Sequence, residues 1–150
     1  MQFSAVRGAA VGNSIILLNA CGGEAYGLEA HITWLPMSNL TINLGGSWTH
    51  IAIRDAGLQS GIYAQCNVTD PVVGGFAQIN NNPFLQAPDY LISLSANYSY
   101  PLAGGDTLFF NTSWWVQGYT NFFLYESREF FSNGNYQGDM KVGYSWPSGN

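Results

Sequence analysis

Large apolar and polar residues alternate with a period of two in five blocks of the chain. Between Leu28 and Trp34 the even-numbered residues are apolar and most odd-numbered residues are polar. The same parity recurs in the blocks 41–49, 92–100, 108–117 and 139–146, although Phe109 and Trp115 interrupt it in the fourth. Such alternation is typical of β-strands whose two faces lie in different surroundings. No stretch of three turns has apolar residues at helical spacing, so the sequence predicts an all-β fold.

The blocks and the turn residues between them predict about six strands in a single antiparallel, up-and-down, strongly twisted sheet without helix. Such a sheet is open when the chain is considered alone. The expected strands lie near 2–18 (interrupted), 24–35, 40–54, 88–101, 106–120 and 134–146.

The connections between these strands alternate between short and long. Tight turns are expected at 36–39, 101–105 and 147–150, and long irregular segments at 55–87 and 121–135. Outer-membrane β-barrels have this asymmetry, with short periplasmic turns and long extracellular loops. The connections therefore favour a transmembrane barrel segment.

The composition supports the same interpretation. Charged residues make up 9% of the 150 residues, against about 25% in ordinary soluble domains. Four Lys and Arg against nine Asp and Glu exclude a binder that follows a nucleic-acid backbone. The longest apolar run, Ile15 to Leu18, is too short for a transmembrane helix. The N-terminus also lacks the pattern of a signal peptide.

The parity assigns residues to two faces. We predict a shared apolar face for Leu28, Ile32, Trp34, Ile42, Leu44, Trp48, Ile92, Leu94, Leu108, Phe110, Trp114, Val116, Met140, Val142 and Tyr144. We predict that the other face carries Glu29, His31, Asn43, Ser47, Ser93, Asn97, Asn111, Ser113, Asp139 and Lys141. In a membrane barrel the apolar face is exposed to lipid. A second layer over that face would favour the alternative, a soluble or secreted β-barrel or β-sandwich domain that binds a small apolar ligand.

The shared parity also predicts strand register, because a slip of one residue inverts a whole strand. Directly opposed residues must have numbers with an even sum. With a three-residue turn at 37–39 the sum is 76, which opposes Trp34 to Ile42, Ile32 to Leu44 and Glu29 to Ser47. Across the 101–105 turn a sum near 206 to 208 places Tyr98 beside Leu108 or Phe110.

Several motifs together resemble the late barrel of TonB-dependent outer-membrane receptors. Glu24-Ala25-Tyr26-Gly27-Leu28-Glu29-Ala30 leads to Trp34-Leu35-Pro36, and the next strand starts at Asn39-Leu40-Thr41. Gln86-Ala87-Pro88 resembles the family's re-entry from an extracellular loop. Tyr100-Pro101 and Tyr144-Ser145-Trp146 resemble its strand ends. The resemblance spans about residues 1–150 and rests on the order and spacing of these motifs.

The resemblance implies a partial barrel domain over 1–150 in the bacterial outer membrane. Such receptors are usually 22-stranded barrels with an N-terminal plug, and they take up scarce ligands such as ferric siderophores with energy from TonB. The plug, the TonB-contacting segment and the closing strand have no counterpart in these residues, so we expect a fragment of the receptor barrel. Its partners would be outer-membrane lipid, the ligand and, in the intact receptor, the TonB complex.

The candidate site residues fall into two groups. The lumen-facing candidates are Glu29, His31, Asn43, Ser47, Asn97, Asn111, Asp139 and Lys141; the candidates for ligand contact in an extracellular loop are Glu126, Arg128 and Glu129. Glu29 and His31 lack a nearby third ligand, so we expect no metal site. The chain has no nucleophile motif or phosphate-binding glycine loop, so we expect neither enzymatic activity nor a cofactor. Cys21 and Cys66 are either one disulfide or two thiols.

Overall fold

The structure is a computed structural model that describes residues 2–9, 12–19, 21–62 and 67–146. Within these ranges the regular structure is entirely β, and its strands pair antiparallel, in the pairs β1-β2, β4-β8, β8-β9, β9-β12, β5-β7, β6-β7 and β10-β11. These ranges contain no helix long and apolar enough to cross a membrane. The prediction of an all-β antiparallel fold is confirmed.

The chain divides into two compact units, which are described separately. The sheet unit comprises Leu28–Trp48, Tyr90–Gln117 and Gly134–Asn150. The loop unit comprises Met1–Gly27, Thr49–Asp89 and Gly118–Asn133.

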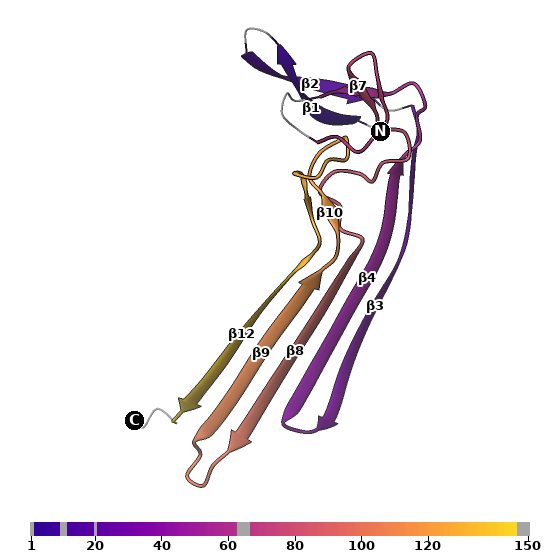
Figure 1. Cartoon of the computed structure of the whole chain (residues 1–150). Helices are drawn as coiled ribbons and strands as arrows, with labels where there is room; N and C mark the ends of the chain where they lie inside the picture. The colour runs from indigo at the N-terminus through magenta and orange to yellow at the C-terminus, as the bar shows by residue number, and fades with distance from the viewer. Residues whose placement is uncertain (1, 10–11, 20, 63–66, 147–150) are drawn as a thin grey trace. The chain divides into compact units, whose positions relative to one another are not determined.

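The main sheet has five strands in the order β12-β9-β8-β4-β3. Their bounds are β3 Gly23–Met37, β4 Leu40–Ile53, β8 Tyr90–Pro101, β9 Thr107–Gln117 and β12 Asn135–Ser145. These bounds agree with the predicted ranges to within three residues at each end. The turns that join β3 to β4 and β8 to β9 lie at the same end of the sheet (Figure 1).

The register of the sheet follows the predicted parity. Paired residue numbers sum to 138 between β4 and β8, to 208 between β8 and β9, and to 252 between β9 and β12. Tyr98 lies opposite Phe110, one of the two predicted partners. Between β3 and β4 the Thr33 hydroxyl donates to Asn43 Oδ1 at 2.9 Å, which places these two odd-numbered residues on the same face.

Two details of the predicted first turn are wrong. The turn has two residues, Ser38 and Asn39, and β3 continues through Pro36 to Met37. Proline lacks a backbone N–H, but β3 is an edge strand of this sheet, where one side of the backbone needs no ladder partner. Pro36 therefore does not end the strand as expected.

The predicted count of six strands in one sheet is also wrong. The described residues contain twelve strands in four sheets. The expected interrupted first strand is a hairpin of β1 Gln2–Ala9 and β2 Gly12–Asn19, which pair with each other. The segments expected to be irregular contain the short strands β5 Gln59–Gly61, β6 Val72–Val73, β7 Phe76–Gln78, β10 Thr120–Asn121 and β11 Phe131–Ser132. Strands of two or three residues are too short for alternation to reveal.

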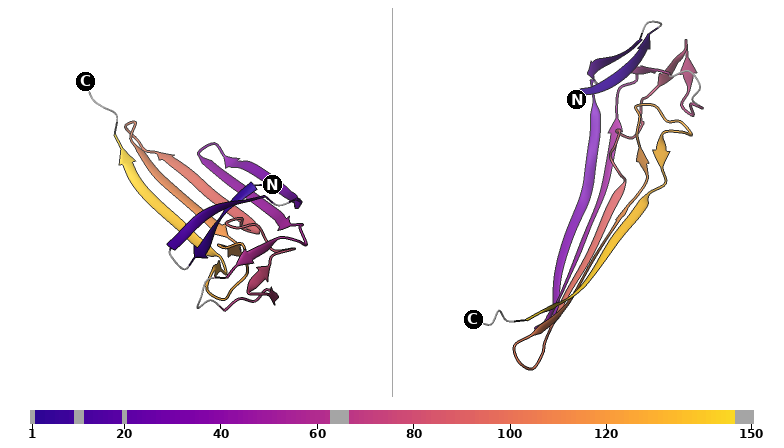
Figure 2. Two further views of the ribbon diagram at one scale, coloured as in Figure 1. Left: turned by 90° about the horizontal axis from the view of Figure 1, so that it is seen from above. Right: turned by 90° about the vertical axis from the view of Figure 1, so that its left-hand side faces the viewer.

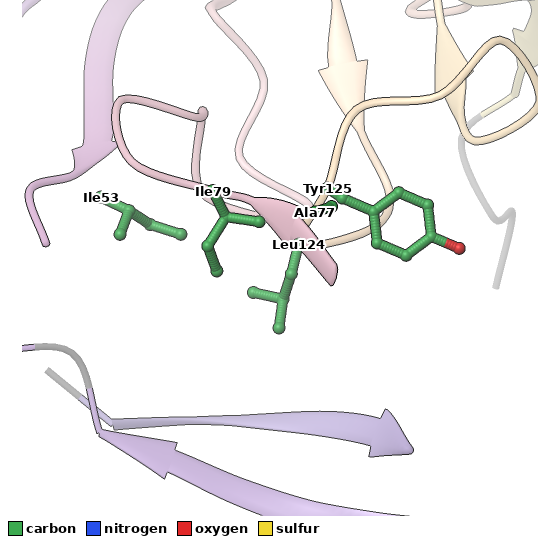
Figure 3. Close-up of a cluster of buried hydrophobic side chains, with 5 residues drawn as sticks. All are labelled: Ile53, Ala77, Ile79, Leu124 and Tyr125. Atoms are coloured by element: carbon green, nitrogen blue, oxygen red, sulfur yellow. The ribbon is translucent and has the colours of Figure 1, made fainter. Parts of the chain in front are cut away.

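The loop unit has the hydrophobic core. Five fully or almost fully buried side chains form it (Figure 3): Ile53, Ala77, Ile79, Leu124 and Tyr125. Partly buried aromatic residues pack around it, and the rings of Phe123 and Phe130 stack with centroids 4.6 Å apart. The long connections thus pack together through their own apolar side chains.

The sheet unit is a single twisted layer (Figure 2), and none of its described residues is buried. Most residues of the predicted apolar face are exposed, including Leu28 at 73% and both Met140 and Val142 at 65%. A shallow depression of about 260 Å³ lies over this face, lined by Ala30, Ile32, Leu44, Gly45, Gly46 and Ile92. The prediction that this face would be exposed is confirmed.

Candidate functional site

A row of small polar side chains crosses the middle of the polar face of the main sheet, which is the face opposite to the exposed apolar one. Register places Asn43, Ser95, Ser113 and Asp139 side by side on β4, β8, β9 and β12. Asn43 Nδ2 donates to Ser95 Oγ at 3.3 Å, and Ser113 Oγ donates to an Asp139 carboxylate oxygen at 2.6 Å. Thr33 of β3 extends the row through its bond to Asn43. This polar row supplies hydroxyl, amide and carboxylate groups across five strands.

A hollow of about 390 Å³ lies beside this row, toward the ends of the strands that lead into the long connections. Its polar and aromatic lining comes from Glu29, His31, Ser47, Ser93 and Trp115. Gly45 lies between these residues, and a Cβ at this position would come within 2.6 Å of Ser93 Oγ and 3.7 Å of His31 Nδ1. The missing side chain therefore keeps the middle of the hollow open.

A second group of predicted residues lies on the other side of the polar row. Asn97, Asn111 and Lys141 are direct cross-strand neighbours on β8, β9 and β12. The Lys141 ammonium lies 5.7 Å from the centre of the Phe109 ring. The register thus places the lumen-facing candidates on one face of the sheet. Sequence reasoning did not assign Trp115 to this face, although its odd number is the signal for it.

The predicted loop residues Glu126, Arg128 and Glu129 connect two segments of the loop unit. The Glu129 carboxylate accepts hydrogen bonds from Asn67 N at 3.0 Å and from Asn67 Nδ2 at 2.7 Å. Arg128 N donates to the Asn67 carbonyl, and the Glu126 carbonyl accepts from Thr69 N. These hydrogen bonds hold residues 126–129 against residues 67–69.

The two carboxyl groups of this segment have opposite pKa shifts. Burial, and then the nearby charge of Asp70, raises the pKa of Glu126. Burial also acts to raise the pKa of Glu129, but hydrogen bonds from the side chain and backbone of Asn67 hold it below its ordinary value. Glu129 is therefore stabilised as the anion, whereas Glu126 is not.

Sequence reasoning missed a polar network inside the loop unit. Asn82 is buried, and its Nδ2 donates to Asp70 Oδ2 at 2.6 Å and to the Leu124 carbonyl at 3.1 Å. Glu126 N donates to the same Asp70 oxygen at 2.8 Å. These bonds join three parts of the loop unit that are far apart in sequence, so proximity in sequence gave no signal for them.

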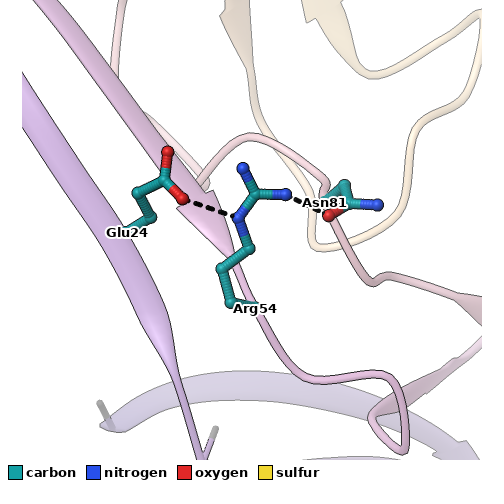
Figure 4. A network of polar contacts seen from close by, with 3 residues as sticks. All are labelled: Glu24, Arg54 and Asn81. Atoms are coloured by element: carbon teal, nitrogen blue, oxygen red, sulfur yellow. Dashed lines mark hydrogen bonds and ion pairs between the residues drawn. The ribbon is translucent and has the colours of Figure 1, made fainter.

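A second network ties the start of β3 to the end of β4 (Figure 4). Arg54 Nε donates to the Glu24 carboxylate at 2.9 Å, and its Nη1 donates to Asn81 Oδ1. The hydrogen bond and charge of Arg54 lower the pKa of Glu24. Asn81 has a φ of 73°, a left-handed conformation that asparagine adopts more readily than most residues. This network holds the long connection at Asn81 next to the start of β3 and the end of β4.

The described residues contain no cluster of three or more side chains that could hold a metal ion. Cys21 is exposed, whereas Cys66 lies outside the described residues, so the disulfide question stays open. Comparisons with protein-family models, with curated proteins and with solved structures found no match to this chain. The two faces of the sheet are thus the main basis for a functional proposal.

Proposed function

We propose that this chain is a wall segment of a bacterial outer-membrane receptor that takes up a scarce ligand, such as a ferric siderophore, with energy from the TonB complex. The exposed apolar face of the single-layer sheet is the observation that carries the proposal. Large apolar side chains are exposed on every one of its five strands. A patch of this extent is typical of a surface that contacts another apolar phase. Lipid supplies that phase for a strand-built wall.

The spacing of aromatic residues on this face fits a bilayer. Tyr90 and Trp48 lie opposite each other at one end, and Tyr100, Tyr144 and Trp146 lie at the other. The ten steps from Tyr90 to Tyr100 span about 33 Å along the strand. At a strand tilt of about 40° they span about 25 Å of membrane thickness, which is the height of the apolar band in outer-membrane barrels.

The polar face and the connections support the same proposal. Small polar side chains such as those of the polar row suit a wet barrel interior. The long connections pack into a core of their own, as expected of ordered extracellular loops that contact ligand. In the intact receptor, ligand would bind on the extracellular side, where the long connections lie, and the TonB complex would act from the periplasm, as the sequence resemblance implies.

The alternative, a soluble or secreted β-domain that binds a small apolar ligand, has weaker support. Such a domain buries the apolar face of its sheet under a second layer or inside a closed barrel. None of the described residues of the sheet unit is buried.

Tryptophan quenching in vesicles tests the proposal. Four of the five tryptophans have even numbers, and Trp115 alone is odd. One variant would keep only Trp114, and a matched variant would keep only Trp115, with phenylalanine at the other four positions. After refolding into vesicles, brominated lipid chains should quench Trp114 strongly and Trp115 weakly, because the two side chains lie on opposite faces.

Iodide enclosed in the aqueous phase provides the control, since it should quench Trp115 more than Trp114. Equal quenching of the two residues by brominated lipid, or failure of the chain to enter vesicles, would contradict the proposal.

A further inference from the structure

We propose that the hollow around Trp115 is a binding site for a neutral, polyhydroxylated ligand, namely a short oligosaccharide. This inference rests on the proposed function, because it names the class of ligand that the receptor wall would contact. Residues of the sheet unit alone line the site. Its polar and aromatic groups belong to Glu29, His31, Ser47, Ser93 and Trp115, and the rest of the lining comes from Ala30, Gly45, Gly46, Leu91 and Ile92.

Trp115 supplies the apolar surface of the site. It is the single tryptophan on the polar face, and 37% of its surface is exposed. Its direct cross-strand neighbours are Ser93 and Gln137, neither of which is a large apolar residue. An indole ring has a flat apolar face and one N–H donor. It can therefore pack against the C–H face of a sugar ring while other groups bind the hydroxyls.

The other side chains around the hollow supply the complementary polar groups. The Glu29 carboxylate accepts hydrogen bonds, whereas the hydroxyls of Ser47 and Ser93 both donate and accept. The His31 ring adds a nitrogen that either donates or accepts a hydrogen bond, according to its tautomer. Sugar hydroxyls also donate and accept, so one ring can satisfy several of these groups. A volume of about 390 Å³ is within the usual range for small-ligand sites.

Gly45 explains why this part of the sheet is hollow. A side chain here would point into the polar face, where its Cβ would lie 2.6 Å from Ser93 Oγ. The backbone of the neighbouring Gly46 also borders the hollow. A Cβ added there would point to the opposite face of the strand, and its nearest atom would be the Leu91 carbonyl oxygen at 4.0 Å. The two glycines are thus a matched pair for testing the site.

The charges favour a neutral ligand over an anionic one. Glu29 is a carboxylate, and neither Lys nor Arg lines the hollow. On the same face Lys141 lies over the Phe109 ring, two rows of the sheet away from Trp115. The whole chain has a net charge of −5. An anionic ferric chelate would therefore be repelled at this position, whereas an uncharged sugar would not.

The full chain refolded in detergent micelles allows a direct test by titration. The neutral probes are maltotriose, cellotriose and xylotriose; an anionic iron(III) tris-catecholate and the cation choline complete the set. We expect saturable binding of at least one trisaccharide, measured by isothermal titration calorimetry. Trp115→Ala should weaken it at least about tenfold, and Trp114→Ala should change it less than about twofold.

The glycine pair keeps the test decisive if Trp115→Ala does not fold. Gly45→Ala should weaken trisaccharide binding, because its methyl group fills the hollow. The methyl group of Gly46→Ala would lie on the opposite face of the strand, so this variant should weaken binding much less than Gly45→Ala does. The inference is overturned if no trisaccharide binds, if only the iron complex or only choline binds, or if both glycine variants have the same effect. Brominated-lipid quenching of Trp114 reports membrane insertion separately, so failure of the sugar site and failure of the membrane proposal give different results.

Discussion

The sheet unit and the loop unit place their large apolar side chains in opposite ways. Ile79 in the loop unit is 0% exposed, whereas Ile32 in the sheet unit is 57% exposed. Both units belong to one chain and were assembled from the same kinds of residue. In the loop unit the apolar side chains cover one another, as they do in the core of a water-soluble protein.

The sheet unit lacks such a core because alternation directs its apolar side chains to one side of a single layer. A strand backbone satisfies its hydrogen bonds within the sheet, so the layer needs no second layer for that purpose. Under the proposed function, the sheet unit faces lipid with its apolar side chains, whereas the loop unit lies in water.

Truncation of the same residue type in the two units should have unequal effects. Ile79→Ala removes a buried side chain and should lower the free energy of unfolding by about 2–5 kcal/mol. Ile32→Ala should change it by about 1 kcal/mol or less, because detergent or lipid fills the space. Urea unfolding of the detergent-refolded chain measures both. Equal losses would mean that Ile32 is covered and that the two units do not differ in this way.

A charge on each face of one strand should show which face meets lipid. Leu94→Lys, in the middle of β8, should destabilise the vesicle-inserted chain by about 2–4 kcal/mol. Asn97→Lys, on the polar face of the same strand, should have little effect. The yield of chain inserted into vesicles at increasing urea concentration is the measurement. If Asn97→Lys is the more harmful change, the two faces have been assigned the wrong way round.

Removal of the buried amide in the loop unit should loosen the long connections. Asn82→Ala leaves Asp70 and the Leu124 carbonyl without their Nδ2 donor, which should cost about 1–3 kcal/mol. Hydrogen exchange should then increase at the backbone amides of residues 67–70 and 124–127. The exposed Asn97→Ala is the control and should leave exchange there unchanged. Unaltered protection in Asn82→Ala would show that the network does not hold these segments.

Two glutamates of the loop unit should have opposite effects on stability at neutral pH. The pKa of Glu126 is raised above 4.5, so its ionisation destabilises the fold as pH rises through the raised value. Glu126→Gln should therefore increase stability at neutral pH. The pKa of Glu24 is lowered, so it stabilises the fold above 4.5 and loses this contribution as pH falls through the lowered value. Glu24→Gln should decrease stability at neutral pH.

Thermal unfolding from acidic to neutral pH compares these two variants with the unaltered chain. Both effects should be small, because both residues are only partly buried and water screens their charges. Shifts of the same sign for the two variants would contradict the assignment.

Much of the sheet unit could be predicted from local pattern. Strand positions followed from alternation between apolar and polar residues, and register followed from parity, as the pairing of Tyr98 with Phe110 shows. Both depend on a period of two that a strand of more than ten residues repeats many times. The site residues on the polar face could be named for the same reason. Trp115 was missed because odd-numbered positions were expected to be polar and tryptophan is apolar. Its odd number nevertheless places it on the polar face.

The loop unit depended on contacts that no local pattern encodes. The bonds of Asn82 to Asp70 and Leu124, and the packing of Ile53 with Tyr125, join residues that are 12 to 72 positions apart. The contacts of Glu126 and Glu129 with the segment around Asn67 are of the same kind, while their contact with ligand stays a prediction.

Neighbouring residues along each strand encode the strands, their parity and the two chemically different faces. The packing of the long connections and the hollow that Gly45 opens beside Trp115 emerge only when distant parts of the chain come together. Such features arise where side chains from separate strands and loops meet, and their positions depend on the whole fold.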